Sequence, residues 1–121
     1  MLNLDTHILL HALTGDLKPT ERRVLSAYQW SISAIVLWET TKLAQLGRIS
    51  VGLDDANVAS ALARVQVWPI TVNVCRALGK LDFRADPANE IIAATSLHHN
   101  VPLVTRDRNL LASRVVPLAR L

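Results

Sequence analysis

Carboxylates follow two short apolar runs that lie near opposite ends of the sequence. The run 2–4 is followed at once by Asp5, and the run 101–104 leads to Asp107 through one threonine and one arginine. In open parallel α/β sheets, ligands bind beyond the carboxyl ends of the strands, where strand-to-helix turns lie. Carboxylates suit hard divalent ions such as Mg²⁺ and Mn²⁺. These two residues therefore predict an acidic, cation-binding site.

Glu39 is a third candidate for this site. On a helix over 34–46, it shares a face with Val36 and Leu43. An acid on an apolar face is costly to bury unless it is paired or binds a metal. The ordinary alternative is a surface pair with Lys42, three residues further along the helix. The sequence leaves both interpretations open.

Asn89 raises a similar question in a helix predicted over 86–99. Its face includes Ile92 and Ala93, so we expect its side chain to point partly inward. The neighbouring Glu90 could interact with the helix dipole or bind a ligand. The sequence does not choose between these two roles.

The three aspartates also have ordinary structural explanations. Asp5, Asp86 and Asp107 each precede a predicted helix, where aspartate commonly serves as an N-cap, and for Asp86 the following proline favours that role. Thr6 and Thr105 border the acids and could hydrogen-bond the carboxylates or cap the turns. As a group, however, acids that hold a metal can orient and activate a water and neutralise charge on a phosphodiester.

Other catalytic chemistries have less support. The sequence has neither a glycine-rich phosphate loop nor a P-loop lysine–serine pair, and no serine lies in a nucleophile elbow. His7 and His11 have the spacing of two ligands on a helix, but no acidic general base lies between them, which argues against zinc-peptidase chemistry. Cys75, the only cysteine, follows an apolar run and is expected to be a buried structural thiol.

The elements that must position these residues are short strands that alternate with helices. This alternation predicts an α/β fold with a parallel sheet that helices cover on both faces. We expect one domain over residues 1–121, because the length suits a single domain and no linker is visible. The predicted strands are 2–4, 30–33, 67–70, 101–104 and 114–117. The predicted helices are 6–13, 20–28 with Thr20 as a candidate cap, 34–46, 54 or 55 to 65, 71–78, 86–99 and 107–112.

Composition narrows the class of protein. Half of the residues are hydrophobic and 19% are charged, which argues against a disordered chain. A net charge of +3 fits an ordinary surface or one that faces phosphates, with Arg106 and Arg108 as candidate contacts. The longest uncharged stretch, 24–38, is shorter than the roughly 20 residues that span a bilayer. The N-terminus has no basic region and carries Asp5 and His7 inside its apolar stretch, which argues against a signal peptide. We therefore expect a cytoplasmic protein without a membrane span.

Four segments of the sequence resemble the PIN-domain ribonucleases, and in detail the VapC toxins of bacterial toxin–antitoxin pairs. They occur in the family's order and cover essentially the whole chain. The segments are Leu-Asp-Thr-His at 4–7, Leu-Trp-Glu at 37–39, Asp-Pro-Ala-Asn-Glu-Ile-Ile-Ala-Ala-Thr at 86–95 and Val-Thr-Arg-Asp at 104–107. Any one of them would be weak evidence, whereas four in order are fairly specific.

The resemblance implies a PIN-like three-layer sandwich, in which helices flank a short parallel sheet. It also implies a Mg²⁺- or Mn²⁺-dependent endoribonuclease that hydrolyses RNA phosphodiesters, forms a homodimer and is neutralised by a VapB-type antitoxin. Residue by residue, the family's metal-binding acids fall on Asp5, Glu39 and Asp107, and its remaining catalytic acid falls on Asn89.

Asn89 is a departure from the family pattern, which has an aspartate at this position. An amide offers a carbonyl oxygen but lacks the charge that gives affinity for a hard cation. The sequence leaves three interpretations open: an impaired enzyme, compensation by Glu90 or Asp86, or a deliberate substitution that makes a toxic nuclease tolerable. The alternative function, from a different class, is a catalytically silent PIN scaffold that binds RNA or an antitoxin.

Overall fold

The computed structural model describes all 121 residues, which form four strands, seven α-helices and one short 3₁₀ helix. In chain order the elements are β1 (Leu2–Leu4), α1 (Thr6–Thr14), α2 (Pro19–Ala27), β2 (Trp30–Ser33), α3 (Ala34–Gln45), α4 (Ala56–Leu62), β3 (Gln66–Trp68), α5 (Val72–Ala77), η1 (Leu78–Lys80), α6 (Pro87–His99), β4 (Leu103–Val104) and α7 (Arg108–Leu111).

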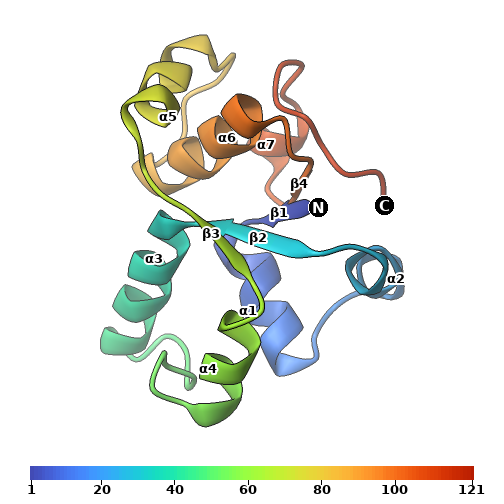
Figure 1. The fold of residues 1–121 in the computed structure, drawn as a ribbon, viewed down its shortest axis with the longest axis vertical. Helices are drawn as coiled ribbons and strands as arrows, with labels where there is room; N and C mark the ends of the chain where they lie inside the picture. Colours follow the sequence, from blue (N-terminus) through green and yellow to red (C-terminus); the bar gives the residue numbers. More distant parts are fainter.

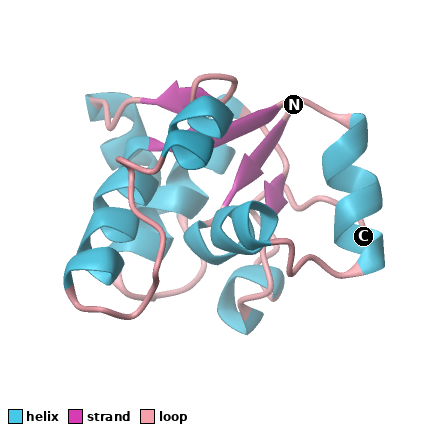
Figure 2. Ribbon diagram, turned by 90° about the horizontal axis from the view of Figure 1, so that it is seen from below, coloured by secondary structure: helices cyan, strands magenta, loops and turns pink.

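The strands form a single parallel sheet in the order β3-β2-β1-β4. Helices α5, α6 and α7 lie on one side of this sheet, and α1, α3 and α4 lie on the other (Figure 1). A view turned by 90° shows the short strands enclosed between the helices (Figure 2). The predicted α/β class and three-layer arrangement are confirmed.

Helices cover both faces of the sheet, so residues of the central strands are largely enclosed whether they are apolar or polar, as in the Leu-Asn-Leu of β1 and the Trp-Ser-Ile-Ser of β2. All three residues of β1 are buried, and Leu4 and Ile32 are fully enclosed. The main core cluster combines these strands with inward-facing residues of the helices, such as Ile8 of α1 and Ile92 of α6. This core fixes the edge of the sheet from which the candidate site residues extend.

The chain changes direction across the sheet beside β1. It proceeds from β1 to β2 and β3 on one side, and it returns to place β4 on the other side. The register pairs Asn3 with Leu103 and Leu4 with Val104, so β1 and β4 end side by side. Such a topological switch point is the usual ligand-binding position in open α/β sheets.

Asn3 is a buried polar residue that ties α6 to the sheet. Its Nδ2 donates to the carbonyl oxygen of Ile92 at 3.3 Å and to Oγ of Ser96 at 2.9 Å. These contacts hold the middle of α6 against β1. They thereby set the position of the first turn of α6, which carries Asn89.

Helix boundaries follow local capping chemistry. Asp5 begins α1 by accepting a hydrogen bond from the backbone N–H of Ile8, and Asp86 begins α6 by accepting one from that of Asn89. Gly15, which ends α1, has a φ of 79°, a left-handed conformation that glycine adopts without strain. The predicted starts and ends of these helices are therefore close to the observed ones.

Several predicted elements differ from the observed ones. The strand predicted at 101–104 forms only at Leu103–Val104, and the helix predicted to end at 65 ends at Leu62. Residues 114–117 form no strand, because only an isolated bridge joins Leu103 to Leu118 beyond β4. The strand predicted at 67–70 ends at Trp68, immediately before the proline that cannot donate to a ladder. Thr20 is not a cap, since α2 already begins at Pro19.

Helix α5 corrects a further expectation. Its buried residues are Val74 and Ala77, which lie one turn apart and face the core. Cys75 is rotated away from that face and is exposed, so the predicted buried thiol is wrong. Separately, none of the helices combines the length and apolar character needed to cross a bilayer.

Candidate active site

Asp5 lies directly after β1, and it is 4% exposed. Its Oδ1 accepts the backbone N–H of Ile8 at 2.8 Å, and its Oδ2 accepts a hydrogen bond from the hydroxyl of Thr105. The carboxylate therefore serves as an N-cap and is also held from the neighbouring strand end. Capping alone does not require the second contact.

Thr105 joins the two aspartates that follow β1 and β4. While its hydroxyl donates to Asp5, its Oγ1 accepts the backbone N–H of Asp107 at 3.0 Å. Asp107 uses Oδ1 to cap α7, where it accepts the N–H groups of Asn109 and Leu110 at 2.9 and 3.1 Å. The other oxygen, Oδ2, accepts no hydrogen bond from the protein and is available for a ligand.

The two aspartates face a cleft of about 290 Å³ at the switch point of the sheet. No hydrophobic residue lines it. Its lining residues are Asp5, His7, His11, Asn89, Arg106 and Asp107. Three of the four site residues predicted from the sequence are thus brought together from β1, α6 and the end of β4.

Asn89 reaches this cleft from the first turn of α6. Its Nδ2 donates to Oδ2 of Asp86 at 3.2 Å, while its backbone N–H donates to Oδ1 of the same residue at 3.0 Å. No protein group donates to Oδ1 of Asn89. The amide therefore offers the cleft a neutral oxygen, and Asp86 is committed to the helix start.

Glu39 takes a different position from the other three. It does not line the cleft, but its Oε1 accepts a hydrogen bond from the hydroxyl of Thr6, the residue next to Asp5. The alternative pairing with Lys42 is absent, since that amine donates to Gln45 at 3.2 Å. Glu39 is therefore connected to the site through Thr6 rather than to the surface charge beside it.

Burial dominates the electrostatics of Asp5. Removal from water raises the pKa of its carboxyl, the hydrogen bonds from Thr105 and Ile8 and the charge of His7 lower that pKa, and the nearby charge of Asp107 makes the smallest contribution, which raises it. The protein thus holds two acids side by side in an environment that disfavours two negative charges. A cation in the cleft would relieve this repulsion.

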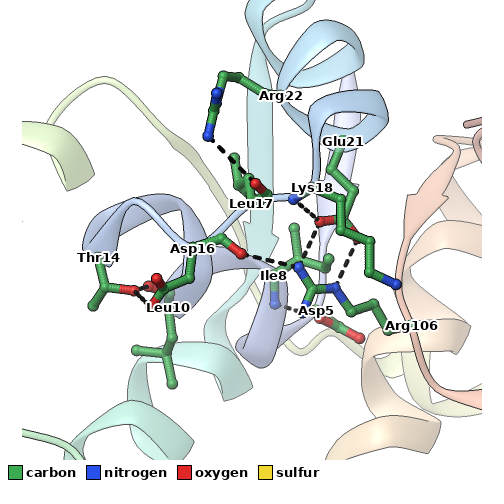
Figure 3. A network of polar contacts seen from close by, with 10 residues as sticks. All are labelled: Asp5, Ile8, Leu10, Thr14, Asp16, Leu17, Lys18, Glu21, Arg22 and Arg106. Carbon is green, nitrogen blue, oxygen red and sulfur yellow. Dashed lines mark hydrogen bonds and ion pairs between the residues drawn. The ribbon is translucent and has the colours of Figure 1, made fainter.

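Arg106, which also lines the cleft, pairs with Glu21 on α2 (Figure 3). Its Nη2 and Nε donate to the two carboxylate oxygens at 2.6 and 2.7 Å, and Nη2 also donates to the carbonyl oxygen of Asp16 at 3.2 Å. Glu21 is 1% exposed and also accepts the backbone N–H of Lys18 at 2.8 Å. The turn before Asp107 is therefore anchored to the start of α2.

This pairing gives the protein an acid-sensitive contact. The hydrogen bonds from Arg106 lower the pKa of Glu21 from 4.5 to about 2. Because the folded-state pKa is depressed, the stabilisation is complete above pH 4.5 and is lost as the pH falls towards 2. Compared with Glu21→Gln, the wild type should lose about 2 kcal/mol of its free energy of unfolding by about pH 3. Urea unfolding of both proteins across this range measures the difference, and a pH-independent difference would contradict the assignment.

The residues of the cleft fit a hard cation only in part. Carboxylate and amide oxygens are suitable ligands, and Mg²⁺ commonly binds through one or two carboxylates while it keeps several waters. Asp5 and Asp107 supply two such carboxylates. However, no three carboxylate, imidazole or thiol groups lie close enough together to enclose one ion.

The structure also adds residues that sequence reasoning left out of the site. His7 and His11 line the cleft, since their four-residue spacing on α1 places both on the side of Asp5. Glu21 supports the cleft through Arg106. Glu21 is the third residue of α2, a position where a glutamate often caps the helix, so that role could be predicted from the sequence. Its pairing with Arg106, 85 residues away, could not be predicted from neighbouring residues.

Fold and site together define an α/β protein with a polar cleft, lined by two aspartates, at the carboxyl edge of a parallel sheet. The comparison with protein families makes the assignment specific. The sequence matches the PIN domain family over residues 3–115, and the chain belongs to that family. A search of the curated proteins found no match.

Solved structures agree with this fold. The chain is similar to one in the crystal structure of VapBC2 from Rickettsia felis bound to a DNA fragment of its promoter, with 17% identity, 98% of each chain covered and a TM-score of 0.76. It is also similar to one in DNA-bound VapBC from Salmonella typhimurium, with 19% identity, 98% of each chain and a TM-score of 0.72. A third is in FitAcB from Neisseria gonorrhoeae, with 19% identity, 98% and 97% coverage and a TM-score of 0.69.

Proposed function

We propose that this chain is a VapC-like toxin, a divalent-metal-dependent endoribonuclease that hydrolyses RNA phosphodiesters. The observation that carries the proposal is the meeting of Asp5 and Asp107 in one polar cleft at the switch point of the sheet. Membership of the PIN domain family supports the same conclusion. The mild positive charge of the chain is compatible with a polyanionic substrate.

Each site residue has a distinct part in this proposal. Asp5 and Asp107 would hold Mg²⁺ or Mn²⁺, Glu39 would reach it through water beside Thr6, and Asn89 would contribute a weak neutral ligand. When bound, such an ion activates water and neutralises charge on a phosphodiester.

Other residues of the cleft would position the carboxylate and the substrate. Thr105 holds Oδ2 of Asp5 in place, so the carboxylate needs little reorganisation when a ligand binds. The imidazoles of His7 and His11 add hydrogen-bonding groups to the same walls, where a phosphate would lie. The burial of Asp5 limits competition from bulk water.

The proposed partners are an antitoxin and a second copy of the chain. The similar structures are named as VapBC, FitAB and other toxin–antitoxin complexes, which favours a VapB-type antitoxin here. We further propose a homodimer in the cytoplasm. Co-expression with the product of an adjacent small gene, followed by co-purification, would test the pairing.

Asp5→Asn tests the enzymatic proposal directly. Asparagine is also a good N-cap, so the fold should be kept while the charge is lost. We expect RNA cleavage in Mn²⁺ to fall at least about tenfold, because one ligand charge is removed, and EDTA to abolish cleavage by the wild type. Asp54→Asn, an exposed acid outside the cleft, is the matched control and should cleave normally. Cleavage that persists unchanged in EDTA would contradict the proposal.

A catalytically silent RNA- or antitoxin-binding scaffold is the second candidate. Two observations favour it: Asn89 is neutral and its amide is bonded to Asp86, and no three carboxylate, imidazole or thiol groups are placed to hold one metal ion. This candidate predicts RNA binding that EDTA does not change and no turnover in Mn²⁺. The same assay therefore separates the two functions.

A further inference from the structure

A second polar cavity lies on the surface where α5, η1 and the end of α6 meet. Its volume is about 370 Å³, and three of its six lining residues have basic side chains, whereas none has a carboxylate. The lining residues are Asn73, Arg76, Ala77, Lys80, Leu97 and His98. Figure 1 shows α5 beside α6 on the side of the sheet opposite α3.

The basic groups of this cavity have no acidic partners. The one ion pair of the protein joins Arg106 to Glu21, so neither Arg76 nor Lys80 is neutralised by a carboxylate. The guanidinium of Arg76 donates only to Oδ1 of Asn73, at 3.4 Å.

Basic residues in the last turn of a helix usually interact with the free carbonyl groups there. Arg76, Lys80 and His98 all occupy such turns, yet no side-chain hydrogen bond joins any of them to a carbonyl oxygen. These side chains are therefore not engaged in hydrogen bonds to the helix ends, although their charges interact favourably with the helix dipoles. Their donors remain free to meet an anion.

A row of aromatic rings orients His98 at the edge of this cavity. The ring of Trp68 stacks on that of His99 with centroids 4.0 Å apart and planes 20° apart. The ring of His98 meets His99 edge-on, with centroids 4.7 Å apart. The exposed imidazole of His98 is thus in contact with a partly buried stack that begins at Trp68 of β3.

This cavity is separate from the acidic cleft. Asn89 and His98 are nine residues apart on α6. At about 1.5 Å and 100° per residue they lie about 13 Å apart along the axis and on opposite sides of the helix. The two cavities share no lining residue. A ligand of the basic cavity therefore does not occupy the proposed catalytic site.

We propose that the basic cavity binds a phosphate group. An arginine fork and a lysine point charge around a polar hollow, with an imidazole and an amide as further donors, suit the tetrahedral oxygens of phosphate. The phosphate comes either from the backbone of RNA or from a small phosphorylated molecule. The chemistry of the cavity is the same for both sources.

The test measures binding in EDTA, so that it is independent of any nuclease activity. The probes are inorganic phosphate and a single-stranded RNA oligonucleotide without terminal phosphates, each titrated by calorimetry at constant ionic strength. The variant Arg76→Gln/Lys80→Gln should weaken binding about tenfold or more, because charge-assisted hydrogen bonds are lost. The control Arg23→Gln/Arg48→Gln removes two charges from exposed arginines elsewhere and should change binding less than about twofold.

The outcomes are distinguishable. If RNA is the source, the variant should also reduce the slope of log affinity against log salt by about 1.4, which corresponds to two lost contacts with a single strand. If inorganic phosphate alone is affected, the ligand is a small phosphorylated molecule. Equal losses in the variant and its control, or no binding of either probe by the wild type, would overturn the proposal. Thermal unfolding checks that all proteins are folded, and both replaced side chains are exposed.

Discussion

Asn89→Asp is expected to raise the affinity of the acidic cleft for Mn²⁺ by about 10- to 100-fold, since the number of charged ligands sets much of the affinity of such sites. The new carboxylate would join Asp5 and Asp107, which already line the cleft. RNA cleavage at limiting metal should increase in proportion. If wild type and variant cleave equally fast, Asn89 is not a deficient ligand position.

The same substitution should destabilise the metal-free protein. In the wild type, Nδ2 of Asn89 donates to Oδ2 of Asp86 at 3.2 Å. An aspartate at this position would place a second carboxylate against that of Asp86 in place of the hydrogen bond. We expect this to lower the free energy of unfolding by about 1 kcal/mol. The variant should therefore unfold at a lower temperature than wild type in EDTA and at a higher one in Mn²⁺.

A matched control separates this effect from a general change of charge. Asn57 lies in the first turn of a helix that an aspartate caps, as Asn89 does, and it is exposed on α4 away from the cleft. Asn57→Asp should alter neither cleavage nor the response of the unfolding temperature to Mn²⁺. If only Asn89→Asp unfolds below the wild-type temperature in EDTA and above it in Mn²⁺, residue 89 is a metal-ligand position.

The edge of the sheet could be predicted because local rules determine it. Asp5 and Asp107 each follow an apolar run, and parallel strands bring their carboxyl ends to one edge. The same rules cannot predict whether residues 114–117 form a strand, because a strand also needs a neighbouring strand with which it can pair in register. Only an isolated bridge forms there, between Leu103 and Leu118. Nor do these rules show that Cys75 faces solvent, because the short helix that carries it could bury either side.

The position of Glu39 shows a second limit. Its place on an apolar helix face indicated that it was not an ordinary surface acid, and its contact with Thr6 agrees with that interpretation. However, the angle between α3 and the cleft depends on packing between helices. The hydrophobic periodicity of a single helix does not predict this angle. The sequence could therefore identify the residue but not its distance from Asp5 and Asp107.

Arg106→Gln is expected to lower the free energy of unfolding by about 3 kcal/mol at neutral pH, because it leaves the charge of Glu21 buried without its partner. Glu21 lies in the interior at 1% exposure, so water cannot replace the two lost hydrogen bonds. Urea unfolding measures the loss. Arg108→Gln, which removes an exposed arginine two residues away, is the control and should change stability by less than about 0.5 kcal/mol.

A double-mutant cycle distinguishes loss of the pair from loss of packing. Glu21→Gln removes the buried charge, so Arg106→Gln should be much less harmful in that background, with a coupling of about 1 to 3 kcal/mol. Because Arg106 adjoins both Thr105 and Asp107, breaking the pair should also loosen the turn that presents these residues to the cleft. Cleavage by Arg106→Gln should then fall even where the protein is fully folded. Additive stability losses in the cycle would show that the ion pair does not anchor the site.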